Sequence, residues 1–78
     1  MKSVRISLDS IDKVKAFVNV INKYDFDFDL VSGRYVIDAK SIMGIFSLDL
    51  SKPIDLNIHA EEDALDAIMS DLSEYIIA

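Results

Sequence analysis

The sequence predicts an α+β fold in which one antiparallel, four-stranded sheet is covered on one face by three helices. Three segments alternate apolar with polar residues, which is the period of a half-buried strand, and a fourth strand is predicted as the return of a hairpin. Two longer segments repeat apolar residues at helical spacing, and a short apolar segment between them is also predicted to be helical. Their order is β-α-β-β-α-β-α, and strands with one polar face need helices on the other face only.

The first strand and the first helix lie near the start of the chain. Val4, Ile6 and Leu8 alternate with polar residues, as in a strand. Either Asp9 or Ser10 can cap the helix that follows, because both side chains accept hydrogen bonds from backbone N–H groups. The apolar positions at helical spacing are Ile11, Val14, Phe17, Val18 and Ile21.

A hairpin is predicted next. Phe26, Phe28 and Leu30 alternate with aspartates, so one face of this strand is packed and the other is acidic. Residues 32–33, Ser-Gly, supply the turn, and residues 34–38 return as the second strand.

The second half of the chain supplies two helices and a strand. Ser41 opens an apolar segment, 42–50, that is predicted to be helical and to end before Pro53. Residues 54–59 alternate as the last strand. The last helix begins with three acids, which the positive end of the helix dipole favours: Glu61, Glu62 and Asp63. Its buried stripe is predicted to contain Ala64, Leu65, Ile68, Met69, Leu72 and Ile76.

Length and composition restrict the function classes. The 78 residues predict a single domain over 1–78, and the net charge of −6 argues against binding nucleic acid or an anionic membrane surface. The absence of cysteine excludes thiolate chemistry and disulfides. The start of the chain lacks the apolar run of a signal peptide, and no segment approaches the ~18 apolar residues of a membrane span. These features predict a soluble cytoplasmic protein.

The polar side chains do not predict an enzyme, a metal site or a bound cofactor. His59, the only histidine, has no partner ligand in the sequence and is expected to be solvated. Asp25, Asp27 and Asp29 project along one strand face at about 7 Å intervals and do not converge on an ion. Tyr24 and the phenylalanines after it lack the interleaved cations of a base-stacking surface, so they are predicted to be core residues. No nucleophile–base pair or phosphate-binding glycine loop is present.

One motif carries a family resemblance. Residues 39–48, Ala-Lys-Ser-Ile-Met-Gly-Ile-Phe-Ser-Leu, resemble the regulatory-serine signature of HPr, the small phosphocarrier of the bacterial sugar phosphotransferase system. Weaker similarity extends over the whole chain. The resemblance implies an open-faced β-sandwich, with four antiparallel strands under three helices, which agrees with the fold that the alternation and spacing predict.

The chain departs from this family at the phosphate-carrying site. The family carries phosphate on a histidine within a His-x-Arg-Pro sequence at the start of the first helix. Counting back from Ser41 without gaps places Ser10 at the histidine, Asp12 at the arginine and Lys13 at the proline. Serine is a poor nucleophile without an adjacent base, and nearby carboxylates repel a phosphoryl group. The sequence therefore predicts that this chain does not carry out histidine phosphotransfer.

Ser41 is the main candidate for regulation. In relatives the matching serine is phosphorylated by an ATP-dependent kinase, and the product acts as a corepressor of catabolite genes. A phosphate here would meet the N-terminus of the predicted helix, with Lys40 adjacent in the sequence. The alternative is an ordinary N-cap serine.

The residues after Ser41 are candidates for binding a protein partner. Ile42, Met43 and Phe46 form a docking surface in the family, and this short segment has more apolar positions than one face can bury. The alternative is that the short helix packs them inward.

Two functions follow as hypotheses. The first is a noncatalytic HPr-like regulator, similar to the catabolite-repression paralogue that lacks the histidine and keeps the serine. Its partner would be a kinase, a transcriptional regulator or a phosphotransferase-system component. The second is an HPr-fold interaction module with no phosphorylation role.

Overall fold

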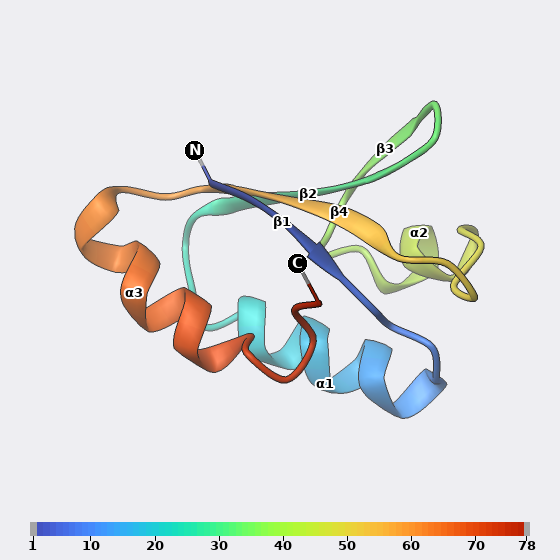
Figure 1. Cartoon of the computed structure of the whole chain (residues 1–78), viewed down its shortest axis with the longest axis horizontal. Coiled ribbons are helices and arrows are strands. Elements are labelled where there is room, and N and C mark those ends of the chain that lie inside the picture. Colours follow the sequence, from blue (N-terminus) through green and yellow to red (C-terminus); the bar gives the residue numbers. More distant parts are fainter. Residues whose placement is uncertain (1, 78) are drawn as a thin grey trace.

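The computed structural model describes residues 2–77, and its elements follow the predicted order β-α-β-β-α-β-α. The strands are β1 (Lys2–Ile6), β2 (Asp27–Ser32), β3 (Tyr35–Asp38) and β4 (Ile54–His59). The helices are α1 (Ile11–Ile21), α2 (Ile42–Phe46) and α3 (Glu62–Asp71). Figure 1 shows all three helices on one side of the sheet, which confirms the predicted fold. Met1 and Ala78, the ends of the predicted domain, lie outside the described residues.

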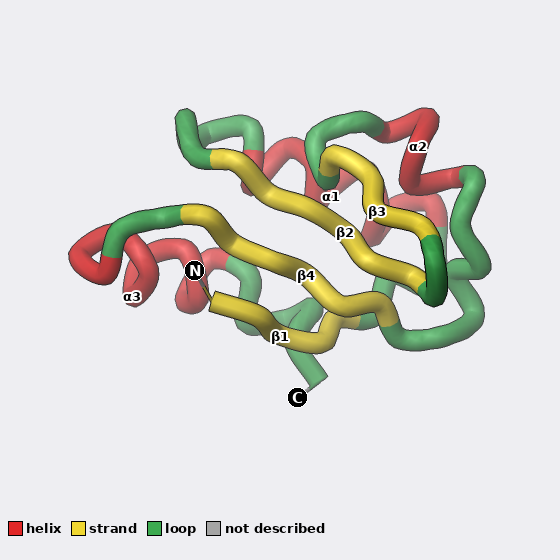
Figure 2. Tube along the Cα trace, turned by 90° about the horizontal axis from the view of Figure 1, so that it is seen from above, coloured by secondary structure: helices red, strands yellow, loops and turns green. Residues whose placement is uncertain are grey.

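The four strands form one antiparallel sheet in the order β1-β4-β2-β3. The central strand β4 pairs with β1 on one side, where Ile54 lies opposite Ile6, and with β2 on the other, where Leu56 lies opposite Leu30. The two strands of the hairpin, β2 and β3, pair with each other. Seen from above in Figure 2, β1 and β3 are therefore the outer strands of the sheet.

Alternate residues of the strands turn toward the helices and form one core with them. Strand residues at most 1 % exposed are Ile6, Phe28, Leu30, Ile54, Leu56 and Ile58. Helix residues at 0 % exposure are Val14, Phe17, Ile21, Ile45 and Ile68. The opposite face of the sheet carries polar and acidic residues and has no helix over it (Figure 1). The strand alternation thus decides which side of the sheet is covered.

Ile11 departs from the predicted apolar face of the first helix. Ile11 is 61 % exposed, whereas Val14 and Phe17 on the same helix are fully buried. Ile11 is the first residue of α1, and Figure 1 shows that this helix begins at one end of the molecule. The helical spacing was correct, but the core does not reach as far as the first turn.

The hairpin turn lies one residue later than predicted. Strand β2 starts at Asp27 and continues through Ser32, which pairs with Tyr35, so Gly33 and Arg34 form the turn. Gly33 has a φ of +59°, a conformation that suits glycine at the first position of a two-residue hairpin turn. The predicted strand boundaries were therefore shifted by one or two residues.

The second helix, α2, is shorter than predicted. It ends at Phe46, whereas the sequence predicted an end near residue 50. Ser47 Oγ donates to the carbonyl oxygen of Gly44 at 2.6 Å, and the Asp49 carboxylate accepts from the backbone N–H of Ser51 at 3.1 Å. Serine and aspartate side chains that bond nearby backbone groups compete with helix continuation. The apolar residues Leu48 and Leu50 belong to this loop and are half-buried against the core.

The end of the chain closes onto the first strand, which the sequence did not predict. Ile76, assigned by its spacing to the last helix, lies beyond α3 and bridges to Ile6. The N–H of Ser7 donates to the carbonyl of Tyr75 at 2.9 Å, and Tyr75 is only 3 % exposed. Its ring meets that of Phe17 edge to face at 5.8 Å between centroids. Tyr75 thus holds the last residues against both β1 and α1.

Within residues 2–77 there is no helix with the length and apolar character needed to cross a membrane.

Removing the Tyr75 hydroxyl should change how stability depends on alkaline pH. Burial, with help from the Glu74 carboxylate, raises the pKa of Tyr75 to about 12. The folded state therefore holds this proton more tightly than the unfolded state, whose tyrosine pKa is about 10. This contribution is complete below pH 10, and about 2 kcal/mol of it is lost by pH 12. The free energy of unfolding of Tyr75→Phe, measured with urea, should lack this loss. If the free energies of the variant and the unmodified chain fell in parallel between pH 9 and 12, the prediction would be contradicted.

Candidate functional site

The start of α1 is the place where the family resemblance puts the phosphate-carrying histidine. Ser10 is the N-cap of α1, with an extended backbone, and its Oγ accepts from the N–H of Lys13 at 3.2 Å. Asp9, the other predicted cap, instead pairs with the ammonium of Lys13 at 3.0 Å, and this hydrogen bond lowers the pKa of Asp9. The hydroxyl of Ser10 is thus an acceptor in a helix cap, beside a carboxylate–amine pair.

The surroundings of Ser10 carry more negative than positive charge. A shallow cavity of about 240 Å³ beside the first turn of α1 is lined by Asp12, Lys13, Ala16, Glu74 and Tyr75. Two of these side chains are carboxylates and one is an amine that already pairs with Asp9. A phosphoryl group approaching this cavity would meet like charge.

The only histidine of the chain lies far from Ser10. Strands β1 and β4 are antiparallel, with Ile6 opposite Ile54 and Lys2 opposite Ile58. His59 follows Ile58, so it lies at the end of the sheet where β1 begins, whereas Ser10 follows the other end of β1. The sheet therefore separates the imidazole from the start of α1 by the length of a strand.

His59 is exposed as predicted, but it has a partner that sequence analysis missed. Its Nε2 lies 2.7 Å from Oδ2 of Asp29 on the open face of the sheet. The register places Asp27 directly opposite His59, and Asp29 is two residues further along β2. The alternating aspartates could have indicated this pair only if the strand order had been known. Among residues 2–77, no three His, Cys, Asp or Glu side chains are placed to hold a metal ion together.

Ser41 stands at the start of α2. It is the N-cap, and its Oγ accepts from the N–H of Gly44 at 3.2 Å. Its own N–H donates to the carbonyl of Asp38 at 3.0 Å, which ties the cap to the end of β3. A Cβ on Gly44 would lie 3.2 Å from this Oγ and 3.4 Å from Cδ1 of Ile37. The glycine of the motif therefore allows the cap and the hairpin to approach the helix closely.

Lys40 points away from Ser41. Its Nζ donates to the carbonyl oxygen of Tyr24 at 2.6 Å and lies 5.7 Å from the ring centroid of Phe28. The Tyr24 hydroxyl in turn donates to the carboxylate of Asp71, a bond that raises the pKa of Tyr24. The positive charge predicted beside Ser41 thus joins the start of α2 to the segment between α1 and β2. Sequence adjacency did not indicate this because the lysine stem crosses to a residue sixteen positions earlier.

The three predicted docking residues divide between surface and core. Met43 is 78 % exposed and Phe46 is 41 % exposed, whereas Ile42 is half-buried against the core. The fully buried residue of α2 is its neighbour Ile45. Figure 1 shows the start of α1, with exposed Ile11, at the same end of the molecule as α2. Met43 and Phe46 therefore project from the short helix that Ser41 caps.

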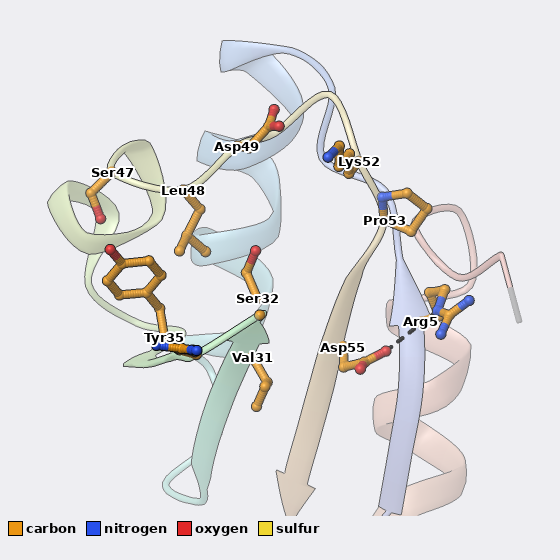
Figure 3. A pocket seen from close by; sticks show the side chains of 12 residues that line it. Arg5, Val31, Ser32, Tyr35, Ser47, Leu48, Asp49, Lys52, Pro53 and Asp55 are labelled. Atoms are coloured by element: carbon orange, nitrogen blue, oxygen red, sulfur yellow. Dashed lines mark hydrogen bonds and ion pairs between the residues drawn. The ribbon is translucent and has the colours of Figure 1, made fainter.

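A larger, open cavity of about 800 Å³ lies at the tip of the hairpin, and none of the predicted site residues lines it. Figure 3 shows its wall formed by Tyr35 from β3, Leu48 and Lys52 from the loop after α2, and Arg5 from β1. Arg5 pairs with Asp55 across the strands at 3.4 Å. Sequence analysis missed this cavity because its walls come from segments that are far apart along the chain.

Comparison with known proteins identifies the family. The model for "PTS HPr component phosphorylation site" matches residues 13–78. The chain belongs to the HPr family. The match begins at Lys13, so Ser10 and Asp12 lie just before the matched span of this HPr-family protein.

Solved HPr structures agree with this assignment. HPr-C-His from Thermoanaerobacter tengcongensis is 27 % identical, with a TM-score of 0.74 over 95 % of this chain and 92 % of that one. Phosphocarrier protein HPr from Bacillus anthracis is 28 % identical, with a TM-score of 0.64 over 90 % and 92 %. The catabolite repression protein Crh from Bacillus subtilis shares the fold, at 24 % identity and a TM-score of 0.63 over 96 % and 90 %.

Substituting Lys40 in this HPr-family protein should cost stability through its bond to Tyr24. Lys40→Met keeps the apolar stem beside Phe28 but removes the ammonium donor. Because hydrogen bonds to charged groups are the stronger ones, we expect the free energy of unfolding to fall by about 1–2 kcal/mol. Lys52→Met, at an exposed lysine, is the matched control and should change it by less than about 0.5 kcal/mol. Equal urea midpoints for the two variants would contradict the structural role of Lys40.

Proposed function

We propose that this chain is a noncatalytic regulatory member of the HPr family, a cytoplasmic protein whose single domain spans 1–78. It acts by binding protein partners through the surface of α2, and phosphorylation of Ser41 switches that binding. The partner class is a kinase, a transcriptional regulator or a component of the sugar phosphotransferase system, in the control of sugar transport or carbon catabolism. It uses no cofactor.

The start of α1 supports the noncatalytic part of the proposal. A phosphohistidine requires an imidazole, and Ser10 offers a hydroxyl that is already an acceptor in the helix cap. A general base within hydrogen-bonding reach would be needed to activate this hydroxyl, and the imidazole of His59 is at the other end of the sheet. Asp12 and Lys13 in place of the family's arginine and proline remove the fixed cation that would steady a transferred phosphate.

The observation that carries the proposal is the position of Ser41 beside an exposed apolar surface. Ser41 is exposed at the N-cap of α2, and Met43 and Phe46 project from the same helix. A phosphate adds a charge of about −1.5 to −2. Placed here, it would convert an apolar docking surface into one with a strong negative charge at its edge.

The position of Lys40 makes this switch sharper. Its ammonium is bound to the Tyr24 carbonyl, so it does not neutralise a phosphate on Ser41 without giving up that bond. Beyond Lys40, the next charged side chain along the chain is that of Asp38, whose carboxylate accepts from the N–H of Lys40 at 2.9 Å. The phosphate charge would therefore be offered to a partner, which favours a partner with a basic surface.

The second candidate is an interaction module without phosphorylation. The observation that favours it is the cap itself, because the Oγ of Ser41 already accepts from the N–H of Gly44 and an N-cap serine needs no other role. In that case the motif was retained to build α2, and Met43 and Phe46 bind the same partner at all times.

Treatment with an HPr kinase and ATP separates the two candidates. We expect intact-mass spectrometry to show one added phosphate on the unmodified chain and on Ser47→Ala, and none on Ser41→Ala. Ser47, the C-cap of the same helix, is the matched control for a nearby serine. Far-ultraviolet circular dichroism of Ser41→Ala verifies that it is folded.

The contrary result is equally clear. If an authentic HPr in the same tube is labelled and this chain is not, the phosphorylation switch is rejected for that kinase and the interaction module remains.

A further inference from the structure

Strand β3 is an uncovered edge of the sheet. On the other side of the sheet, the N–H of Ile77 donates to the carbonyl of Arg5 at 2.8 Å, so the end of the chain covers part of β1. No described segment pairs in this way with the outer side of β3. Two of its four residues are strongly exposed, Tyr35 at 70 % and Val36 at 64 %. An exposed strand edge of this kind is a template for pairing with another chain.

The backbone of β3 presents particular groups on this edge. Ser32 and Tyr35 flank a two-residue turn, and the N–H of Ala39 donates to the carbonyl of Phe28 at 2.8 Å. Because backbone groups alternate along an antiparallel strand, Tyr35 and Ile37 also direct theirs toward β2. The N–H and C=O of Val36 therefore point outward.

We propose that a second copy of this chain pairs with β3 in antiparallel fashion, around a two-fold axis at Val36. Val36 then exchanges both backbone hydrogen bonds with Val36 of the second copy. In the same register Tyr35 lies opposite Ile37, and Arg34 lies opposite Asp38. The interface is isologous, so each of these pairs occurs twice.

The opposite charges of Arg34 and Asp38 favour a second copy as the partner of β3, and they also favour one register of the paired strands. Arg34 and Asp38 are two residues from Val36 on either side, so only a ladder centred on Val36 puts each cation opposite an anion. A ladder centred on Tyr35 would place Arg34 opposite Val36, and one centred on Ile37 would place Asp38 opposite Val36. Opposite charges across strands stabilise a pair, and like charges destabilise it.

The residues involved are available for this pairing. Arg34 is exposed and makes no ion pair with another described residue. Asp38 uses Oδ1 to accept from the N–H of Lys40, which leaves Oδ2 for the guanidinium. The carbonyl of Asp38 accepts from Ser41, and a carbonyl oxygen has a second lone pair. Four residues make a small interface and each copy carries a net charge of −6, so the dimer is weak and forms with rising concentration.

Sedimentation equilibrium from about 10 μM to 1 mM tests the pairing. We expect dimers to form across this range. Arg34→Asp places aspartate opposite aspartate twice and should weaken association by about tenfold or more. The double variant Arg34→Asp/Asp38→Arg restores both pairs with exchanged signs and should return to within about threefold of the original constant.

A control variant tests whether the effect of the charge change is specific to the edge of β3. Lys15→Asp makes the same charge change on an exposed position of α1 and should leave association unchanged within about threefold. A monomer at every concentration, which would leave β3 to a different occupant, overturns the proposal. So does a dimer that Arg34→Asp does not weaken, or one that the double variant does not restore while circular dichroism shows it folded.

Discussion

The burial of a single face of the sheet is the constraint on which the rest of this structure depends. In β1, β2 and β4 apolar residues alternate with polar ones, so Ile6, Leu30 and Leu56 can leave water only if helices cover their side. Burying one such side chain is worth about 1.5–3 kcal/mol, which makes any arrangement with helices on both faces costly. The short helix α2 lies on this same side and buries Ile45 fully, whereas Met43 and Phe46 remain exposed.

The same strand arrangement places His59 and the start of α1 in different parts of the molecule. The antiparallel pairing of β1 with β4 places the start of α1 away from His59, which pairs with Asp29 on the uncovered face. Ser10 and Ser41 are both N-caps whose Oγ accepts from the N–H three residues later. Their surroundings differ: Ser10 lies beside carboxylates, whereas Ser41 lies beside an exposed apolar helix. This difference in surroundings is the basis of our proposal that Ser41, and not the start of α1, is the phosphorylated site.

The sequence pattern correctly predicted those features of the fold that depend on neighbouring residues. The strand alternation, the helical spacing of α1 and the caps at Ser10 and Ser41 depend on neighbouring residues, and each is present in the structure. The errors concern how far elements extend. Ile11 has the spacing of a core residue but lies beyond the core, and α2 stops at Phe46 because the side chains that follow bond their own backbone.

The contacts that sequence analysis missed all join distant segments. The bond from Lys40 to the Tyr24 carbonyl, the pair of His59 with Asp29 and the burial of Tyr75 depend on strand order and register, which no local pattern contains. The central claim, that this chain does not carry phosphate on histidine, is tested most directly with the phosphoryl-donor proteins of the sugar phosphotransferase system. An authentic HPr in the same tube should gain one acid-labile phosphate by intact-mass spectrometry while this chain stays at its unmodified mass. An acid-labile phosphate on this chain would contradict the account.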